Sequence, residues 1–164
     1  MISYTTTTLI QQPISKVYAL LCDDTQVPLW LKGLQQIETI SGKPGQKGFK
    51  AKYTFVENNR TIIFYEEITA AESGQSFSAT LQSDSLVLEG HTRLEDFNGQ
   101  TRLVAQQKVR AKSFIMKLLL PFLKSMMRKR QQEDFFRFKQ LAEGNLQTAD
   151  TEVLTLFDKS RGQS

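Results

Sequence analysis

The stretch SLVLEGHTRLEDFNGQTRLVAQQKVRA, residues 85–111, decides the fold class of this chain. Apolar and polar residues alternate on both sides of Asn98-Gly99, and an Asn-Gly pair between two alternating runs is the strongest short-range signal for a β-hairpin. In the first run the even positions from Leu86 to Leu94 carry most of the apolar residues, so we expect them to face the core. The inward positions of the second run are then Leu103, Ala105, Gln107 and Val109.

The same alternation extends toward the N-terminus as far as residue 35. Gly, Asn, Asp and Pro interrupt it at the intervals expected of a meander of hairpins. We therefore predict strands at 35–41, 48–57, 61–70, 75–83, 85–96 and 101–111. A segment rich in β-branched residues, from Ile2 to Gln11, predicts a further strand before them.

Helical segments flank the meander. Pro13 to Cys22 predicts a short amphipathic helix. A second short helix, ending near Gly33, carries Val27, Leu29, Trp30 and Leu34. Residues 113–143 predict one long helix with a kink or break near Pro121, because an internal proline removes a backbone hydrogen bond. We predict a single domain at 1–143 and a C-terminal tail at 144–164.

Four local features carry a resemblance to known proteins. They are Pro13-Ile14-Ser15-Lys16-Val17-Tyr18 after the first strand, Asp23 followed by Trp30, Gly48-Phe49 opening the third strand, and the proline-interrupted terminal helix. With the element order, they resemble the helix-grip (SRPBCC) superfamily, which includes the birch pollen allergen, START lipid-transfer domains, polyketide cyclases and coenzyme-Q-binding proteins. The resemblance implies an α+β fold: a curved seven-stranded antiparallel sheet around a long C-terminal helix, with two short helices between strands 1 and 2. It also implies a cavity between helix and sheet.

Composition excludes several classes of protein. The 164 residues leave room for one domain, and 40% hydrophobic with 23% charged residues is typical of a soluble globular protein. With one cysteine, Cys22, and one histidine, His91, the chain cannot build an intrachain disulfide, a catalytic triad or a histidine-rich metal site. We expect no metal and no cofactor. The N-terminus lacks the pattern of a secretory signal, so we expect a cytoplasmic protein.

Four polar residues fall on the inward parity of the predicted sheet: Tyr53, Glu66, Thr92 and Gln107. A buried carboxylate either finds hydrogen bonds or has its pKa raised by desolvation, and a raised pKa suits a general acid or base at neutral pH. Glu66 and Tyr53 are therefore the catalytic candidates. The alternative, which we favour, is that Glu66 lies at the cavity mouth and meets water or a lysine. His91 shares its parity with Glu89 and Arg93, and we expect it on the convex face.

These residues lead to three hypotheses about function. The first is non-enzymatic binding or transport of a small hydrophobic molecule, such as a lipid, an isoprenoid or a polyketide-like compound. The second is a cyclase or dehydratase that uses Glu66 as acid/base and Tyr53 as proton donor. The third is an interaction protein with a filled cavity, which uses residues 153–157 or the basic helix. The expected ligand-binding residues are Trp30, Tyr53, Phe55, Phe64, Glu66, Phe77, Leu88, Thr92, Gln107, Phe114, Leu118 and Phe122.

A basic cluster marks the long helix. Arg128-Lys129-Arg130 follows Lys112, Lys117 and Lys124. We expect a solvated helix face, offset by Glu133 and Asp134, and keep peripheral docking to anionic lipid as the alternative. Nucleic acid is not an expected partner, because the aromatic residues are not interleaved with the basic ones.

Overall fold

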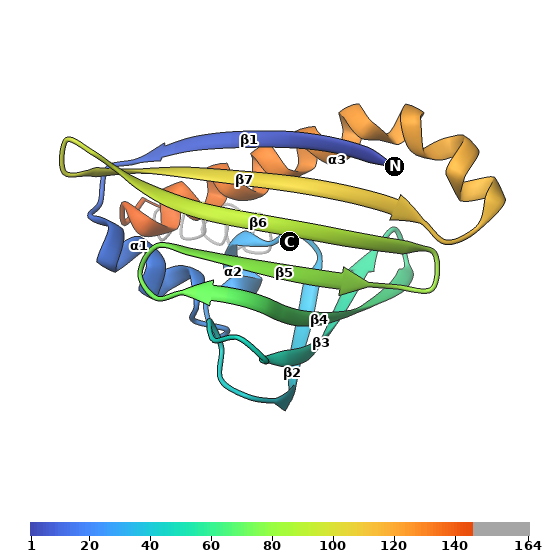
Figure 1. The fold of residues 1–164 in the computed structure, drawn as a ribbon, viewed down its shortest axis with the longest axis horizontal. Coiled ribbons are helices and arrows are strands. Elements are labelled where there is room, and N and C mark those ends of the chain that lie inside the picture. The colour runs from blue at the N-terminus through green and yellow to red at the C-terminus, as the bar shows by residue number, and fades with distance from the viewer. Residues whose placement is uncertain (146–164) are drawn as a thin grey trace, which may run out of the picture.

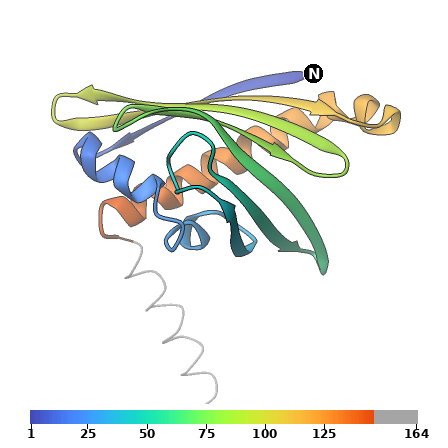
Figure 2. The same cartoon turned by 60° about the horizontal axis from the view of Figure 1, so that its bottom comes forward.

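The computed structural model describes residues 1–145, and Figures 1 and 2 show one curved sheet with the helices on one side of it. The elements are β1 (Ile2–Ile10), α1 (Ile14–Leu21), α2 (Val27–Trp30), β2 (Leu34–Ser41), β3 (Lys50–Glu57), β4 (Arg60–Glu72), β5 (Ser76–Gln82), β6 (Leu86–Phe97), β7 (Gln100–Ala111) and α3 (Phe114–Ala142). Apart from its first two residues, the predicted tail at 144–164 lies outside the described residues, as do residues 153–157.

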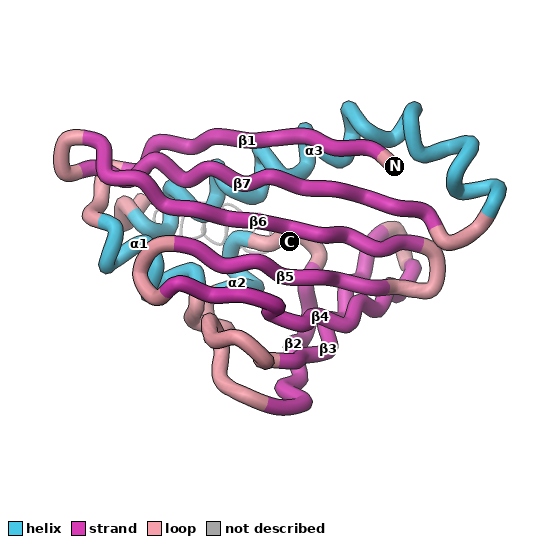
Figure 3. Tube along the Cα trace, in the orientation of Figure 1, coloured by secondary structure: helices cyan, strands magenta, loops and turns pink. Residues whose placement is uncertain are grey.

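The seven strands form a single antiparallel sheet in the order β1-β7-β6-β5-β4-β3-β2. Each strand from β2 to β7 pairs with the next along the chain. The first strand then pairs with the last, with Thr6 opposite Ala105. Figure 3 shows the resulting continuous layer of strands. The predicted fold class is confirmed.

The predicted turns are found where the backbone needs left-handed dihedrals. Asn98 and Gly99 have φ values of 54° and 80°, as a two-residue hairpin turn requires. Asn58 and Asn59, with φ values of 48° and 59°, form the turn between β3 and β4. Asparagine tolerates this region better than most residues, so both hairpins are fixed by local sequence.

Strand register places the predicted inward residues on one face of the sheet. Thr92 pairs with Phe77 on one side and with Ala105 on the other. Across the β3–β4 pair, Ala51 lies opposite Glu66. Because side chains alternate with a period of two, each pair fixes the face of its whole strand.

The second short helix is shorter than predicted. It ends at Trp30, and Leu34, predicted as part of it, begins β2 instead. Leu31 is already extended, with φ −91° and ψ 107°, and Gly33 adopts a φ of 77°. The left-handed glycine therefore redirects the chain into the sheet one turn earlier than the apolar spacing indicates.

The long helix α3 is continuous through Pro121. Its first turn is capped by Ser113, whose side chain accepts a hydrogen bond from the backbone N–H of Met116. Figures 1 and 2 show its N-terminal part turned away from the line of the remainder, so the helix bends rather than breaks. No helix among residues 1–145 is long and apolar enough to cross a membrane.

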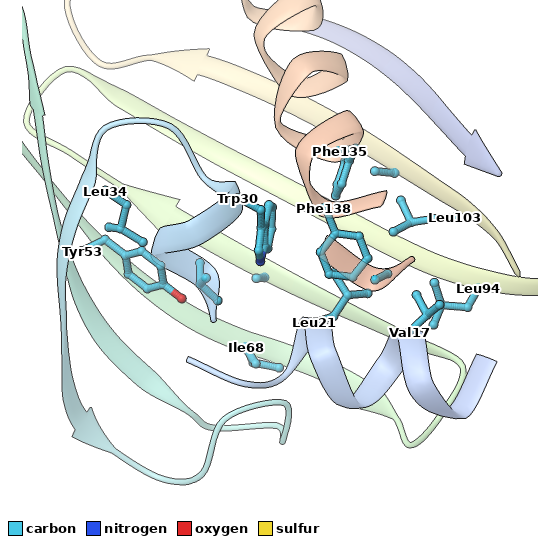
Figure 4. Packing of buried hydrophobic residues seen from close by; sticks show 14 of the residues in the cluster. Val17, Leu21, Trp30, Leu34, Tyr53, Ile68, Leu94, Leu103, Phe135 and Phe138 are labelled. Atoms are coloured by element: carbon cyan, nitrogen blue, oxygen red, sulfur yellow. The ribbon is translucent and has the colours of Figure 1, made fainter. Parts of the chain in front are cut away.

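The main core lies where the C-terminal half of α3 meets the two short helices and the concave face (Figure 4). Trp30 packs against two aromatic rings of α3, with ring centroids 6.0 Å from Phe135 and 5.1 Å from Phe138. A second, smaller cluster forms around Ile2, Val109 and Leu120. The helix is therefore fixed to the sheet at two separate places.

Asp134 connects α3 to the loop after α2. Its carboxylate is 5% exposed, accepts a hydrogen bond from the backbone N–H of Lys32 at 3.1 Å, and pairs with the Arg137 guanidinium. Arg137 also donates to the Trp30 carbonyl, at 3.0 Å. Arg130 donates to Glu57 of β3 at 2.6 Å. The prediction that Arg130 and Asp134 belong to a solvated face was wrong, because both join these long-range contacts.

We expect Asp134→Ala to lower the free energy of unfolding by about 2–3 kcal/mol, since it leaves the Lys32 N–H and the Arg137 guanidinium without their acceptor. Denaturant unfolding measures the change. The control is Glu133→Ala, one residue away and exposed, with an expected change within about 0.5 kcal/mol. Equal losses in the two variants would contradict the assigned role of Asp134.

Candidate functional site

A tyrosine and a carboxylate meet on the concave face of the sheet. Tyr53 of β3 donates a hydrogen bond from its hydroxyl to Glu66 Oε2, at 2.7 Å. The register places Tyr53 opposite Phe64 and Glu66 opposite Ala51, so the two polar residues are diagonal neighbours. On its other side Glu66 lies opposite Leu81. The pair is thus surrounded by apolar side chains, as the alternation predicted.

The pKa of Glu66 is raised to about 7, chiefly by burial. The hydrogen bond from Tyr53 lowers this pKa, and the negative charge of Asp24 raises it. Burial and the negative charge of Glu66 together raise the pKa of the Tyr53 hydroxyl. Near neutral pH the carboxyl group of Glu66 therefore exists in both protonation states, while Tyr53 remains a hydrogen-bond donor.

The end of α1 contributes two more titratable groups to this region. Burial raises the pKa of the Cys22 thiol, a hydrogen bond from Tyr18 opposes this, and the charges of Asp24 and Glu66 raise it again. Burial likewise raises the pKa of Asp24. Sequence reasoning missed Cys22 and Asp24, because only the fold brings the end of α1 to the face of β4.

The loop between β2 and β3 closes over Cys22. Gly45 has a φ of 77°, and a Cβ atom there would lie 2.8 Å from Cys22 Cβ. The Tyr18 hydroxyl donates to the Gly45 carbonyl at 3.4 Å. Only glycine combines this backbone angle with so close an approach.

The indole nitrogen of Trp30 is buried, and no residue in the described part of the chain accepts a hydrogen bond from it. Figure 4 shows this nitrogen and the Tyr53 hydroxyl both directed toward the middle of the buried cluster. A buried donor without an acceptor costs free energy. Trp30 therefore belongs to the core, where it also presents an unused donor.

Thr92 and Gln107 form a second polar group on the same face. Both are partly exposed. Gly90, two residues before Thr92 on β6, lies directly opposite Gln107 of β7. A Cβ atom on Gly90 would lie 3.1 Å from Gln107 Oε1, so the glycine leaves room for the amide to lie over β6. Burial raises the pKa of Tyr4, the β1 partner of Gln107, to about 12.

The other apolar residues predicted to bind the ligand divide into an interior set and an exposed set. Phe55 is buried in the main core, and Phe64 and Phe77 pack against it. Leu88 packs against the smaller cluster. The remaining three residues do not line the interior: Phe114, Leu118 and Phe122 are 74%, 59% and 83% exposed. On this part of α3 the buried residue is Leu120, and helical geometry directs these three away from the sheet.

A surface depression of about 790 Å³ reaches Glu66 from outside. It lies where β4 extends past the β5–β6 hairpin, since pairing of β4 with β5 begins only at Tyr65. Residues of both faces of β4 line it, including Ile62, Tyr65 and Glu66, and Lys112 lies at its margin. Among the described residues, the first part of β4 has no strand partner on the side of β5, and the depression passes around this free edge.

His91 lies on the opposite face, as predicted. It pairs with Ser78 across β5 and β6, and its Nδ1 is 2.9 Å from the Ser78 hydroxyl oxygen. Within residues 1–145, no three His, Cys, Asp or Glu side chains come close enough to hold a metal ion.

Comparison with known proteins establishes the fold. No protein-family model matches the chain, and a search of curated proteins finds no match. Among solved structures, Ara h 8.0201 superposes with a TM-score of 0.72 at 18% identity, over 88% of this chain and 99% of that one. The Zhui aromatase/cyclase from Streptomyces sp. R1128 gives 0.72 at 11% identity, over 87% and 93%. A conserved protein from Geobacillus kaustophilus gives 0.74 at 12%, over 87% and 96%.

We expect the titration of Glu66 to be visible in the stability of the fold. Its folded pKa lies above its unfolded value, so the stability it contributes is present below about pH 4.5 and declines as the pH rises toward 7. The slope reaches at most about 1.4 kcal/mol per pH unit. Denaturant unfolding across this range measures it, and Glu66→Gln should remove it.

A spectroscopic control separates the effect of Tyr53. Tyr53→Phe deletes the hydrogen bond that lowers the pKa of Glu66, so carbon NMR of the labelled carboxyl group should report a pKa higher than in the wild type. An unperturbed Glu66 in both proteins would contradict the burial argument.

Proposed function

We propose, on the premise that this chain has the helix-grip fold, that it binds a small hydrophobic molecule carrying a carbonyl or hydroxyl group. The proposal rests on the Tyr53–Glu66 pair, in which the Tyr53 hydroxyl donates to a Glu66 carboxyl group with a pKa of about 7 on a mainly apolar face. Such a site combines a large apolar contact with a few polar groups that fix orientation.

The concave face supplies the apolar contact. Several of its inward residues on β5 and β6 are only partly buried, namely Phe77, Leu81 and Leu88. The contacts of α3 with the sheet are chiefly with β1 and, less, with β7, so the axis of the helix runs nearer to that side of the sheet than to β4 and β5. Covering this exposed apolar surface with a ligand removes it from water, which favours binding.

The polar groups supply orientation at two ends of this face. Glu66 and Tyr53 form one group, and Thr92 and Gln107 form the other. A ligand carbonyl can accept a hydrogen bond from the protonated carboxyl group of Glu66, and a ligand hydroxyl can donate to its ionised form. The depression beside β4 offers the ligand a way to Glu66.

Filling the concave face should prevent binding. We expect Thr92→Trp to reduce the fluorescence of bound N-phenyl-1-naphthylamine, an uncharged apolar probe, at least fivefold. The matched control is His91→Trp, the adjacent residue on the opposite face, which should leave the signal unchanged. Equal signals in the wild type and Thr92→Trp would place the probe elsewhere and contradict the proposal.

A second candidate function is a dehydration or cyclisation reaction of such a ligand. The specific observation in its favour is the Glu66 pKa of about 7, which suits a general acid or base, together with a tyrosine donor at 2.7 Å. The solved structure described as an aromatase/cyclase has the same fold, which supports this chemistry as a candidate. In this scheme Glu66 removes or delivers the proton, and Tyr53 donates to the substrate oxygen.

Mass analysis of extracted ligand distinguishes binding from dehydration, including a cyclisation that releases water. If the chain catalyses dehydration, Glu66→Gln purified from cells should carry a compound heavier than the wild-type ligand by one water. If the chain only binds, both proteins carry the same compound and the variant carries less of it. Identical compounds in both proteins would exclude the dehydratase.

A further inference from the structure

We propose that the N-terminal half of α3 is a docking surface for membranes that contain anionic lipid. The surface consists of an apolar row, defined as Phe114, Leu118, Phe122 and Met126, and a cationic row, defined as Lys117, Lys124 and Arg128. The proposal concerns the outer side of the helix and does not depend on a ligand in the concave face.

The apolar row is directed to solvent. Its four side chains are 74%, 59%, 83% and 62% exposed, in chain order, and Ile115 beside them is 72% exposed. Residues four apart lie on one side of a helix, so the row is continuous along three turns. The sheet-facing side of the same turns is occupied by Leu120, which is 1% exposed. A contiguous exposed row of large apolar residues marks an interaction site.

The cationic row lies next to the apolar one. Lys117, Lys124 and Arg128 are seven and four residues apart, which places them on one side of the helix, adjacent to Leu118 and Phe114. All three are exposed, and none takes part in a salt bridge among residues 1–145. No aspartate or glutamate occurs anywhere between residues 97 and 132. The surface therefore has positive charge without local compensation.

The charge pattern identifies the occupant. An interfacial helix combines large apolar residues with lysines and arginines along the edge of its apolar face, so that rings enter the acyl boundary and cations meet headgroups. A second copy packed on this surface would bring two cationic rows together, which is unfavourable. The surface also lies at an accessible end of the molecule, because Figures 1 and 2 show the first turns of α3 extending past the strands.

The docking surface adjoins the depression that leads to Glu66. Lys112, two residues before the start of α3, lines that depression and donates to the Ser83 carbonyl at 2.6 Å. A protein docked through α3 would thus hold the opening beside β4 near the lipid surface. This geometry suits a ligand that partitions into membranes.

Vesicle sedimentation with the full chain tests the proposal. We expect the protein to sediment with vesicles of phosphatidylcholine mixed with phosphatidylglycerol, to bind phosphatidylcholine alone at least tenfold more weakly, and to be released by salt. Phe122→Ser should reduce binding about tenfold or more. The matched control is Phe136→Ser, which changes a 55% exposed phenylalanine on the same helix outside the docking surface and should bind as the wild type does.

A charge variant tests the second row. Lys117→Gln with Lys124→Gln should weaken binding to anionic vesicles about tenfold or more, whereas Lys43→Gln with Lys47→Gln, in the β2–β3 loop, should not. Failure of the wild type to sediment with anionic vesicles at low salt would overturn the proposal. So would a dimer in solution that Phe122→Ser converts to monomer, since a second copy would then be the occupant.

Discussion

The C-terminal half of α3 is held by one junction, where Phe135 and Phe138 pack on Trp30 and Asp134 makes its ionic contacts, and the accessibility of the concave face depends on that position. A buried carboxylate needs compensation, and here a backbone N–H and an arginine from one turn further along α3 provide it. Arg130 adds a contact with β3 on the same side. With these contacts in place, the backbone of α3 lies against β1, β7 and the short helices and farther from β4 and β5.

Two polar regions of the molecule illustrate the two ways in which a buried charge is managed. Burial raises the pKa of Asp134, but the Lys32 N–H and the guanidinium groups of Arg137 and Arg130 oppose this by stabilising the ionised form. Among residues 1–145, Glu66 has a tyrosine hydroxyl as its hydrogen-bond donor, and the neighbouring charge on Asp24 is of the same sign, so its protonated form is favoured. Structural roles favour the first arrangement, whereas a proton that can be exchanged at neutral pH requires the second.

The sequence was sufficient for the sheet and for the extent of the long helix, but not for the faces of that helix, for a physical reason. In a meander each strand reports its own face through a period of two, so residues such as Glu66 and Thr92 could be placed without knowledge of their partners. The first turns of α3 carry large apolar residues on more than one side, and Phe122 and Leu120 cannot be assigned to opposite sides from periodicity alone. The contact of Asp134 with Lys32 and the approach of Gly45 to Cys22 join residues distant in sequence, and no local pattern carries that information.

Because Gly45 packs closely on Cys22, the reactivity of the only cysteine of the chain reports the position of the loop between β2 and β3. The thiol is partly buried, and burial raises its pKa, so little reactive thiolate is present while the loop packs on Cys22. When residues 42–48 lift, the sulfur meets water and alkylating reagents. The labelling rate at low reagent concentration therefore reports the equilibrium population of the open loop over the Glu66 region, without any probe attached to the site itself.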